Sequence, residues 1–248
     1  MTTTTSRNGR LGNQIFRNIA VSIVSEKQNL LVNYSSLKLI KSLGIPLFSG
    51  TRTFKKNKEI NLRDDNYFEI LSKPRESIES NLQPNYSYFQ TNLISNFIYN
   101  YLRSQEIRDK IMECNPFKTC YDNNSDCFIH IRLTDVANKN PGIDYYLKAL
   151  AQVPNIESET VYIASDDVEH SIIKSIVSKY PKTVIVKDNE IRTIQFGSTC
   201  KHIILSHGSF SAVIGYLGFF SHIYYPKYDS GNMWYGDMFS IPGWNQID

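Results

Sequence analysis

The sequence predicts an α/β fold with parallel sheets. From residue 127 onward, short and continuously apolar segments such as Phe128–Ile131 and Thr160–Ala164 alternate with helical patterns such as Asp144–Val153. Continuous apolar strands between amphipathic helices are typical of a parallel sheet that is covered on both faces. Near the N-terminus a glycine-containing loop, Arg7–Gln14, leads into a second helical pattern, as at the start of a wound α/β unit.

Length and composition limit the range of functions. The chain has 248 residues, of which 41% are hydrophobic and 21% charged, so it can bury one ordinary core or two small ones. The net charge of +3 is too small to favour nucleic-acid binding, and no block of Lys or Arg follows one face.

The elements of the first half follow from periodicity and turn residues. Met1–Ser6 is a short strand or a disordered end, and apolar residues from Ile15 to Val24 recur at helical spacing. Residues 48–85 are polar, interrupted by proline, and predict no clear element. The remaining predictions are a strand at Leu30–Tyr34, a helix at Ser36–Leu43 and one or two helices from Asn92 to just before Pro116.

The second half is predicted in more detail. The polar stretch Asn115–Asp126 is the best candidate for a boundary, which gives halves 1–115 and 116–248. Besides the segments already named, the predicted elements are a helix at Val168–Tyr180, a strand at Thr183–Val186, a helix at Glu190–Thr199, a strand at His202–Ser206, a helix at Phe210–Phe220 and a last strand at His222–Tyr225.

The cysteines and apolar runs indicate a cytoplasmic setting. Cys114, Cys120, Cys127 and Cys200 show neither a CxxC pair nor metal-ligand spacing, which favours reduced thiols, although a Cys114–Cys120 disulfide stays possible. No apolar run is long enough to span a bilayer, and the N-terminal residues do not show the pattern of a signal peptide. Abundant Asn, Lys, Ile and Tyr suggest an AT-rich genome, so we expect the cytoplasm of a bacterial or virus-infected cell.

The end of the strand Phe128–Ile131 carries the most informative side chains. Arg132 follows the strand directly, and an arginine at a buried strand end needs an anionic partner. Asp135 can supply that partner as an ion pair that closes the strand end. A phosphate is the other candidate, because a guanidinium holds it through two parallel hydrogen bonds. Both interpretations remain open from these residues alone.

Two further strands are expected to end in polar residues at the same edge of the sheet. One ends in Ser165-Asp166-Asp167 and the other in the segment Ser206–Ser211. Taken singly, each end has a simple structural interpretation. Ser209 would cap the helix at Phe210–Phe220, and Asp166 or Asp167 would cap the helix at Val168–Tyr180. Together with Arg132, these strand ends favour a bound phosphate or nucleotide, since ligands of such sheets bind at the carboxyl ends of the strands.

Metal and nucleophile chemistry are not predicted. Asp166 and Asp167 are adjacent, so on an extended backbone they point to opposite sides, and no nearby His or third carboxylate completes a site for a hard cation. His130 and His207 are interpreted as structural hydrogen-bonding residues. No Ser-His-Asp spacing stands out.

Several motifs then match a known family. Gly9-Arg-Leu-Gly-Asn-Gln-Ile-Phe16 resembles the Gly-Gly-Leu-Gly-Asn-Gln-Met-Phe loop of α-1,2-fucosyltransferases and the Gly-Arg-x-Gly-Asn-Gln loop of protein O-fucosyltransferases. His130-Ile-Arg-Leu-Thr-Asp135 is similar to their His-x-Arg-Arg-x-Asp motif, and Tyr145-Tyr-Leu-Lys-Ala149 to the helix that follows it. The remaining matches are Ser165-Asp-Asp167, Ser209-Phe-Ser211 with Gly215, and the tail from Pro226 through Trp234 to Trp244.

The resemblance, to glycosyltransferase family 11, implies a GT-B-like fold of two Rossmann-like halves with mostly parallel sheets that face each other across a cleft. Residues 1–115 would form the acceptor-side half and residues 116–248 the half that binds the nucleotide sugar. The implied reaction is transfer of fucose from GDP-fucose to a hydroxyl of a glycan acceptor, with inversion and without a metal or other cofactor.

The resemblance also assigns roles to individual residues. Arg132 would grip the diphosphate and stabilise the charge of the leaving group. The implied catalytic residues are Arg132, Asp135 and Asn13. The implied donor-binding residues are Gly12, Asn13, His130, Arg132, Asp166, Asp167, Ser209, Phe210 and Ser211. For the general base, Asp135 and Asp144 are candidates by their chemistry, and the acceptor-binding residues stay unassigned.

Three departures bear on the donor. The second arginine of the family motif is Leu133 here, the glycine before Asp135 is Thr134, and a tryptophan pair is replaced by Ala212-Val213. Loss of a cation beside a diphosphate is expected to weaken donor binding or alter the sugar accepted. The alternatives are therefore a related transferase that uses another nucleotide sugar, and a non-catalytic protein that binds a nucleotide or sugar.

Overall fold

The computed structural model describes residues 2–55, 57–135, 139–227 and 237–248. The chain divides into two compact units, one with the residues up to Lys110 together with Asp237 and Met238, the other with the residues from Ile111 onward. The division falls inside helix α5 (Gln105–Cys114), a few residues before the boundary expected at 115/116. Trp234, part of the tail motif, lies outside the described residues.

The second unit contains a parallel sheet of six strands in the order β10-β9-β8-β5-β6-β7. The strands are β5 (Cys127–Ile131), β6 (Val161–Ser165), β7 (Thr183–Ile185), β8 (His202–Ile204), β9 (His222–Pro226) and β10 (Asn245–Ile247). The last predicted strand is therefore followed by one more. β10 was not predicted because it is a short edge strand with two polar residues. It pairs in parallel with β9.

β5 lies inside the sheet, at the point where the order in which the chain adds strands reverses. β5 pairs with β6 on one side and with β8 on the other, and all these pairings are parallel. The chain therefore moves outward from β5 toward β7 and later outward from β8 toward β10. In doubly wound sheets such a switch point opens a crevice at the carboxyl ends of the strands, and the end of β5 carries Arg132.

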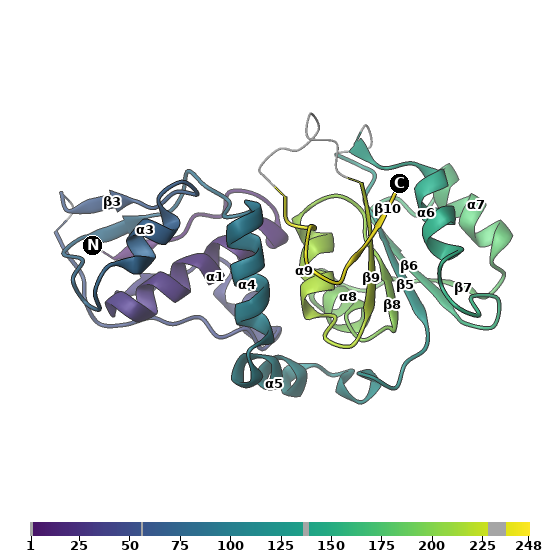
Figure 1. The fold of residues 1–248 in the computed structure, drawn as a ribbon, viewed down its shortest axis with the longest axis horizontal. Coiled ribbons are helices and arrows are strands. Elements are labelled where there is room, and N and C mark those ends of the chain that lie inside the picture. The colour runs from purple at the N-terminus through teal and green to yellow at the C-terminus, as the bar shows by residue number, and fades with distance from the viewer. Residues whose placement is uncertain (1, 56, 136–138, 228–236) are drawn as a thin grey trace. The chain divides into compact units, whose positions relative to one another are not determined.

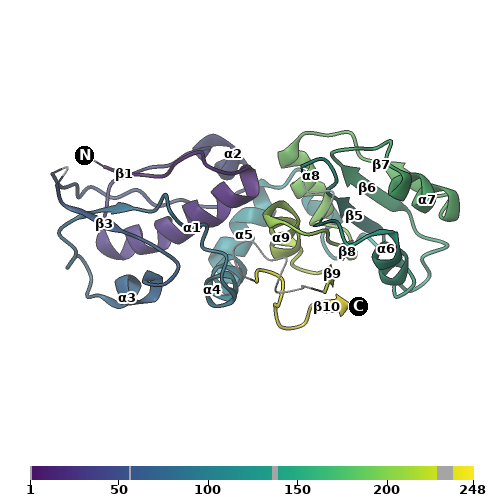
Figure 2. The same ribbon diagram turned by 90° about the horizontal axis from the view of Figure 1, so that it is seen from above.

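Helices cover both faces of this sheet, as expected for parallel strands. Figures 1 and 2 show α6 and α7 on one face and α8 and α9 on the other. Their bounds are α6 (Ile143–Leu150), α7 (Ser171–Lys179), α8 (Glu190–Gly197) and α9 (Ser209–Leu217), and a short 3-10 helix (Lys118–Cys120) precedes the sheet. Each helix predicted here is present, but each is shorter than predicted.

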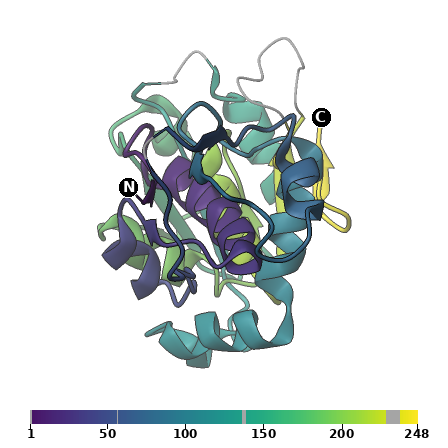
Figure 3. The same cartoon turned by 90° about the vertical axis from the view of Figure 1, so that its left-hand side faces the viewer.

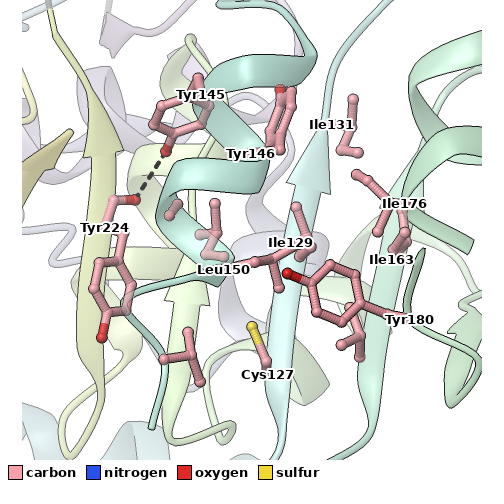
Figure 4. Packing of buried hydrophobic residues seen from close by; sticks show 14 of the residues in the cluster. Cys127, Ile129, Ile131, Tyr145, Tyr146, Leu150, Ile163, Ile176, Tyr180 and Tyr224 are labelled. Atoms are coloured by element: carbon pink, nitrogen blue, oxygen red, sulfur yellow. Dashed lines mark hydrogen bonds between the residues drawn. The ribbon is translucent and has the colours of Figure 1, made fainter. Parts of the chain in front are cut away.

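The core between the sheet and α6 is apolar and fully enclosed. Ile129 and Ile131 of β5 pack with Tyr146 and Leu150 of α6 (Figure 4). Tyr145 reaches the sheet through its hydroxyl, which donates to the carbonyl oxygens of Leu205 at 2.6 Å and Tyr224 at 3.3 Å. Burial raises the pKa of Tyr145 well above its ordinary value, so the hydroxyl remains a neutral donor. This contact ties α6 to β8 and β9, on one side of the switch point.

The first unit is built around helix α1 (Leu11–Gln28), which is buried along most of its length and crosses the unit in purple in Figure 3. Its strands form two parallel pairs, β1 (Thr3–Thr4) with β2 (Val32–Asn33), and β3 (Glu59–Asn61) with β4 (Asn81–Gln83). The other helices of the unit are α2 (Leu37–Ser42), α3 (Tyr67–Ser72) and α4 (Asn92–Arg103).

The sequence predicted this unit less completely. The strand expected at Leu30–Tyr34 is reduced to Val32–Asn33, and the segment 48–85 contains β3, α3 and β4 where no element was expected. Strands of two or three residues with polar side chains carry too little periodicity to be recognised. All four cysteines are free thiols, so a Cys114–Cys120 disulfide is absent.

Candidate functional site

Arg132 leaves the carboxyl end of β5 with its side chain only 11% exposed. Its Nε and Nη2 donate to the two carboxylate oxygens of Asp135, at 3.1 and 2.7 Å, in a parallel two-point pair. The Asp135 side chain is 42% exposed. The ion pair considered from the sequence is thus present in the structure, and it holds the guanidinium plane in a defined orientation at the strand end.

The Arg132 guanidinium lies beside the start of helix α9. Gly208 precedes this helix with φ of 106°, and a Cβ atom there would lie 3.1 Å from Arg132 Nη1. Any side chain at Gly208 would therefore crowd the guanidinium as well as strain the backbone. The expectation that Ser209 caps α9 is wrong, because Gly208 is the N-cap and Ser209 is the first helical residue. Because Gly208 has no side chain, the N-cap residue itself supplies no side-chain cap.

His130 and Ser211 connect β5 to α9. His130 Nδ1 and Ser211 Oγ are 2.5 Å apart, and the main-chain N–H of Ser206 donates to the same oxygen at 3.2 Å. The Ser211 oxygen therefore forms hydrogen bonds with both the His130 ring and the backbone of the loop after β8. Burial lowers the pKa of His130 to about 4, so the ring stays neutral near pH 7. Phe210 packs on this ring with centroids 5.0 Å apart.

Asp166 closes the loop that carries Arg132 and does not cap a helix. Its Oδ1 accepts from the N–H groups of Leu133 at 2.7 Å and Thr134 at 3.3 Å, and its Oδ2 accepts from the Thr134 hydroxyl at 2.7 Å. Burial alone would raise the pKa of Asp166, but the hydrogen bonds from Thr134 and Leu133 lower it below its ordinary value. The carboxylate is therefore charged and engaged with the loop.

Asp167 likewise does not cap helix α7. Its Oδ1 accepts from the N–H of Glu169 at 3.1 Å and so shapes the turn before the helix. The cap is His170, whose Nδ1 accepts from the N–H of Ile172 at 3.2 Å. A helix start three residues further along explains the error, because the polar run Asp-Asp-Val-Glu-His offers several candidate caps.

Two departures from the family motif have clear structural consequences. Leu133 is 2% exposed and packs in the core with Tyr146, so its side chain points away from the strand end. Thr134 supplies the hydroxyl that binds Asp166. A glycine at Thr134 could offer only its N–H, so this chain anchors the Arg132 loop with one additional side-chain hydrogen bond.

Asn140 is a residue of this site that the sequence analysis missed. Its Nδ2 donates to the carbonyl oxygen of Arg132 and to the hydroxyl of Tyr146, both at 3.0 Å. Its Oδ1 accepts from the N–H of Gly142 at 2.9 Å. Asn140 thus fixes the backbone of Arg132 against helix α6. Its position before Pro-Gly indicated a turn, but nothing in the sequence linked that turn to Arg132.

Gly12 and Asn13 belong to the first unit and lie in the first turn of α1. Gly9 has φ of 80°, and a Cβ atom there would come within 2.5 Å of Asn13 Nδ2, so the loop needs glycine for its backbone and for this close contact. Asn13 Oδ1 accepts from Nε2 of Gln90 at 2.9 Å. The side chain of Gln14 closes the loop, since its Nε2 donates to the carbonyl oxygen of Gly9 at 2.8 Å.

The structure therefore gathers most of the predicted site residues in the second unit. Around the ends of β5, β6 and β8 it brings together His130, Arg132, Asp135, Asp166, Asp167, Ser209, Phe210 and Ser211. Among the described residues, no group of three or more His, Cys, Asp or Glu side chains is arranged to hold a metal ion. None of the helices in the described part of the chain combines the length and apolar character needed to cross a membrane.

This arrangement can bind an anion. A guanidinium offers a planar pair of donors, and an adjacent helix start whose N-cap residue is a glycine offers main-chain N–H groups. Both lie at the switch point of a doubly wound sheet, where phosphate-containing ligands bind. The same groups can stabilise negative charge that develops on a departing phosphate.

Comparison with solved structures supports the fold. Escherichia coli heptosyltransferase WaaC with ADP is similar over 91% of this chain and 87% of its own, with 8% identity and a TM-score of 0.50. The same enzyme with ADP-2-deoxy-2-fluoro heptose matches over 93% and 91%, also with 8% identity and a TM-score of 0.50. UDP-GlcNAc 2-epimerase from Methanocaldococcus jannaschii matches over 90% and 82%, with 9% identity and a TM-score of 0.39. The fold is GT-B-like with mostly parallel sheets, as predicted.

Comparison with known sequences identifies the family. No curated protein sequence matches the chain. The model of the family described as glycosyl transferase family 11 matches residues 1–247, which is nearly the whole length and includes every motif quoted above. The predicted resemblance is confirmed, and the chain belongs to glycosyl transferase family 11, a family of glycosyltransferases.

Proposed function

We propose that the protein transfers fucose from GDP-fucose to a hydroxyl of a glycan acceptor, with inversion at the anomeric carbon and without a metal. Membership of glycosyl transferase family 11 supports a nucleotide-sugar donor and a glycan acceptor. The choice of fucose and GDP rests on the resemblance of the glycine loop and the His-x-Arg motif to fucosyltransferases.

The observation that carries the proposal is the position of Arg132. Its guanidinium is nearly buried at the carboxyl end of the central strand and lies against Gly208 at the start of α9. A diphosphate bound there meets a planar cation and main-chain N–H groups at once. When the bond between sugar and phosphate breaks, these groups meet the charge on the leaving diphosphate, which removes the need for a divalent cation.

Asp135 has two roles in this proposal. In the absence of donor it pairs with Arg132 and keeps the guanidinium oriented, which avoids the cost of a nearly buried, unpaired charge. Because the Asp135 side chain is 42% exposed, its carboxylate can turn toward solvent and leave donors of Arg132 to the phosphate. Once released, Asp135 is also a candidate for the base that accepts the proton of the acceptor hydroxyl.

Of the other predicted site residues, some contact the donor and the rest hold the site in shape. Ser209 and Phe210 present the first turn of α9 to the donor. The resemblance to fucosyltransferases assigns donor contacts to Gly12 and Asn13 as well. His130, Ser211, Asp166 and Asp167 act by holding the strand ends and loops in place, since their polar atoms bind within the fold.

A different nucleotide sugar is the second candidate, and Leu133 is the observation in its favour. The family motif has an arginine at this position, whereas Leu133 is buried in the core. The chain therefore has one cation fewer near the diphosphate than the motif prescribes, and a donor with other contacts to the protein could compensate.

Nucleotide binding tests the proposal directly. We expect GDP to raise the melting temperature more than UDP, ADP or CMP at equal concentration, because a ligand that binds only the folded state stabilises it by mass action. Arg132→Lys is the control variant, since it keeps the charge but loses the planar fork. A larger shift with UDP or ADP would replace the donor assignment and leave the family membership intact.

Turnover tests the chemistry. With GDP-fucose and a panel of oligosaccharide acceptors, we expect fucosylated product of inverted configuration, and no loss of rate in excess EDTA. Activity that EDTA abolishes and manganese restores would contradict the role given to Arg132 and the start of α9.

A further inference from the structure

The turn Ser87–Gln90 of the first unit makes contacts that the roles assigned above do not explain. It follows strand β4 and contains Phe89, whose side chain is fully buried although its backbone is left-handed, with φ of 58°. This backbone region is rare for a bulky residue, and such residues persist only where the surrounding structure fixes them. Gln90, the next residue, donates from Nε2 to Asn13 Oδ1 at 2.9 Å.

Burial of the Phe89 ring holds the turn from the core side. The ring packs against Tyr67 with centroids 5.7 Å apart, and the Tyr67 hydroxyl donates to the carbonyl oxygen of Ala20 in α1 at 3.2 Å. The strained backbone of Phe89 is therefore tied to the helix whose first turn carries Asn13.

Arg17 holds the same turn from the side of α1. It is 1% exposed, and its Nε donates to the carbonyl oxygen of Ser87 at 3.1 Å. Its Nη1 donates to the carbonyl oxygens of Ser6 at 3.4 Å and Asn8 at 3.1 Å, in the segment that leads into the glycine loop. The guanidinium also lies 5.0 Å from the centre of the Tyr88 ring. One buried cation thus joins the turn to the glycine loop.

Asp64 closes the turn from a third side. The main-chain N–H of Asp64 donates to the Ser87 hydroxyl at 3.1 Å. Burial is the largest influence and raises the pKa of Asp64, while the nearby Ser87 hydroxyl and the N–H groups of Phe89 and Gln90 act in the opposite direction. Three separate segments, α1, the glycine loop and the loop after β3, therefore fix the backbone on which the Gln90 side chain stands.

We propose that Gln90 is a positioning residue that sets the orientation of the Asn13 amide. Gln90 is 1% exposed, so solvent does not compete for its hydrogen bond. Because Nε2 of Gln90 occupies the side of Asn13 Oδ1, the amide cannot rotate without losing that bond. The NH2 group of Asn13 then faces the other way, over Gly9, where only a glycine leaves space. Asn13 therefore acts in the donor site as a hydrogen-bond donor toward oxygen atoms.

This role rests on the proposed function, because Asn13 is assigned there to the donor site. Gln90→Leu keeps the approximate volume and removes the hydrogen bond, and a double-mutant cycle with Asn13→Ala tests whether Gln90 acts through Asn13. We expect Gln90→Leu to lower kcat/KM for the donor about tenfold, as for loss of one positioned hydrogen bond. We expect the double variant to be no less active than Asn13→Ala alone.

A matched control separates positioning from stability. Gln28 at the end of α1 is another fully buried glutamine, and its side chain binds the Pro74 carbonyl oxygen at 2.9 Å and the Ile78 N–H at 3.1 Å. Gln28→Leu should lower the melting temperature at least as much as Gln90→Leu, yet keep a normal kcat/KM at a temperature where both are folded. Equal kinetic losses in both variants, or additive losses in the cycle, would overturn the role of Gln90.

A second measurement does not depend on the donor. In ¹⁵N-labelled protein, the side-chain amide signals of Asn13 are identified by their absence in Asn13→Ala. We expect these signals to shift in Gln90→Leu and to stay in place in Gln28→Leu, and unshifted signals in Gln90→Leu would overturn the proposal. If wild-type protein and Gln28→Leu are both inactive with GDP-fucose, the proposed function fails, and the amide signals still decide the role of Gln90.

Discussion

Two arginines, one in each unit, are held in opposite ways. Arg132 pairs with a carboxylate that is 42% exposed, whereas Arg17 is 1% exposed and donates to main-chain carbonyl oxygens and to the Ser6 hydroxyl. A carboxylate on a loop can turn away and be replaced by a phosphate, but carbonyl oxygens of the surrounding backbone cannot leave without unfolding it. The comparison favours the proposed ligand-binding role for Arg132 and a structural role for Arg17.

The largest effect should follow from Arg132→Ala. A donor aimed at developing charge contributes on the order of 3–4 kcal/mol to the transition state, so turnover should fall about 100- to 1000-fold. Stability without ligand should change by less than about 1 kcal/mol, because the ion pair involves an exposed partner. Turnover and urea unfolding of the same variant measure both quantities.

The neighbouring residue supplies the control for Arg132. Leu133 is buried in the core, so Leu133→Ala should cost about 2–5 kcal/mol of unfolding free energy and affect turnover less than Arg132→Ala. An Arg132→Ala protein that melts much earlier but transfers sugar at a nearly normal rate would remove the distinction between the two arginines.

Arg17→Met should show the reverse pattern of Arg132→Ala. The change leaves the carbonyl oxygens of Ser87, Ser6 and Asn8 without a donor, and we expect a loss of about 3 kcal/mol in urea unfolding. Arg17→Lys should recover only part of it, because one ammonium group cannot replace the fork. Arg192→Met is the matched control, since Arg192 forms a partly exposed pair with Asp188 and its loss should cost less than about 1 kcal/mol. Equal effects in the two Met variants would contradict the structural role of Arg17.

Lowering the pH should destabilise the second unit more than the first. Every histidine lies in the second unit, at positions 130, 170, 202, 207 and 222. Burial lowers the pKa of His130 and of His202 to about 4, so between about pH 6.5 and 4 the unfolded state binds more protons than the folded state. Stability of this unit therefore falls as the pH falls through that window, by on the order of 3 kcal/mol from His130.

The first unit lacks this sensitivity, and the raised pKa of Asp64 acts in the opposite direction there, because the folded state takes up a proton more readily. Hydrogen exchange at pH 7 and pH 5 measures the two units separately. We expect protection to decrease mainly in β5, β6 and β8, and His202→Gln should reduce the decrease. A larger loss of protection in α1 would show that the histidines do not govern acid sensitivity.

The smallest effect concerns the loop that carries Arg132. Thr134→Val keeps the shape of the side chain and removes the hydroxyl that binds Asp166, so unfolding should become easier by about 1 kcal/mol. The KM for the donor should rise as well, because the loop is held less firmly, while kcat changes little. A loss of stability with an unchanged KM would show that Thr134 stabilises the fold but does not affect donor binding.

Much of the second unit could be predicted because each element is local. Continuous apolar strands and amphipathic helices alternate from Phe128 onward, and a parallel sheet brings the ends of β5, β6 and β8 to one edge whatever the details. That geometry alone predicts that Arg132, Asp166 and Ser211 are neighbours. The family motifs, which lie in the same loops, then pointed to glycosyl transfer.

The sequence by itself determined the fold class, the family and the residues at the strand ends. Only the tertiary structure decided what those residues do. Asp166 binds the Arg132 loop instead of capping a helix, and Gln90 reaches Asn13 from 77 positions along the chain. The physical reason is that a hydrogen bond depends on the positions of two atoms in space. Periodicity and turn residues specify the local backbone, but the partner of a buried polar side chain is chosen by how distant segments pack.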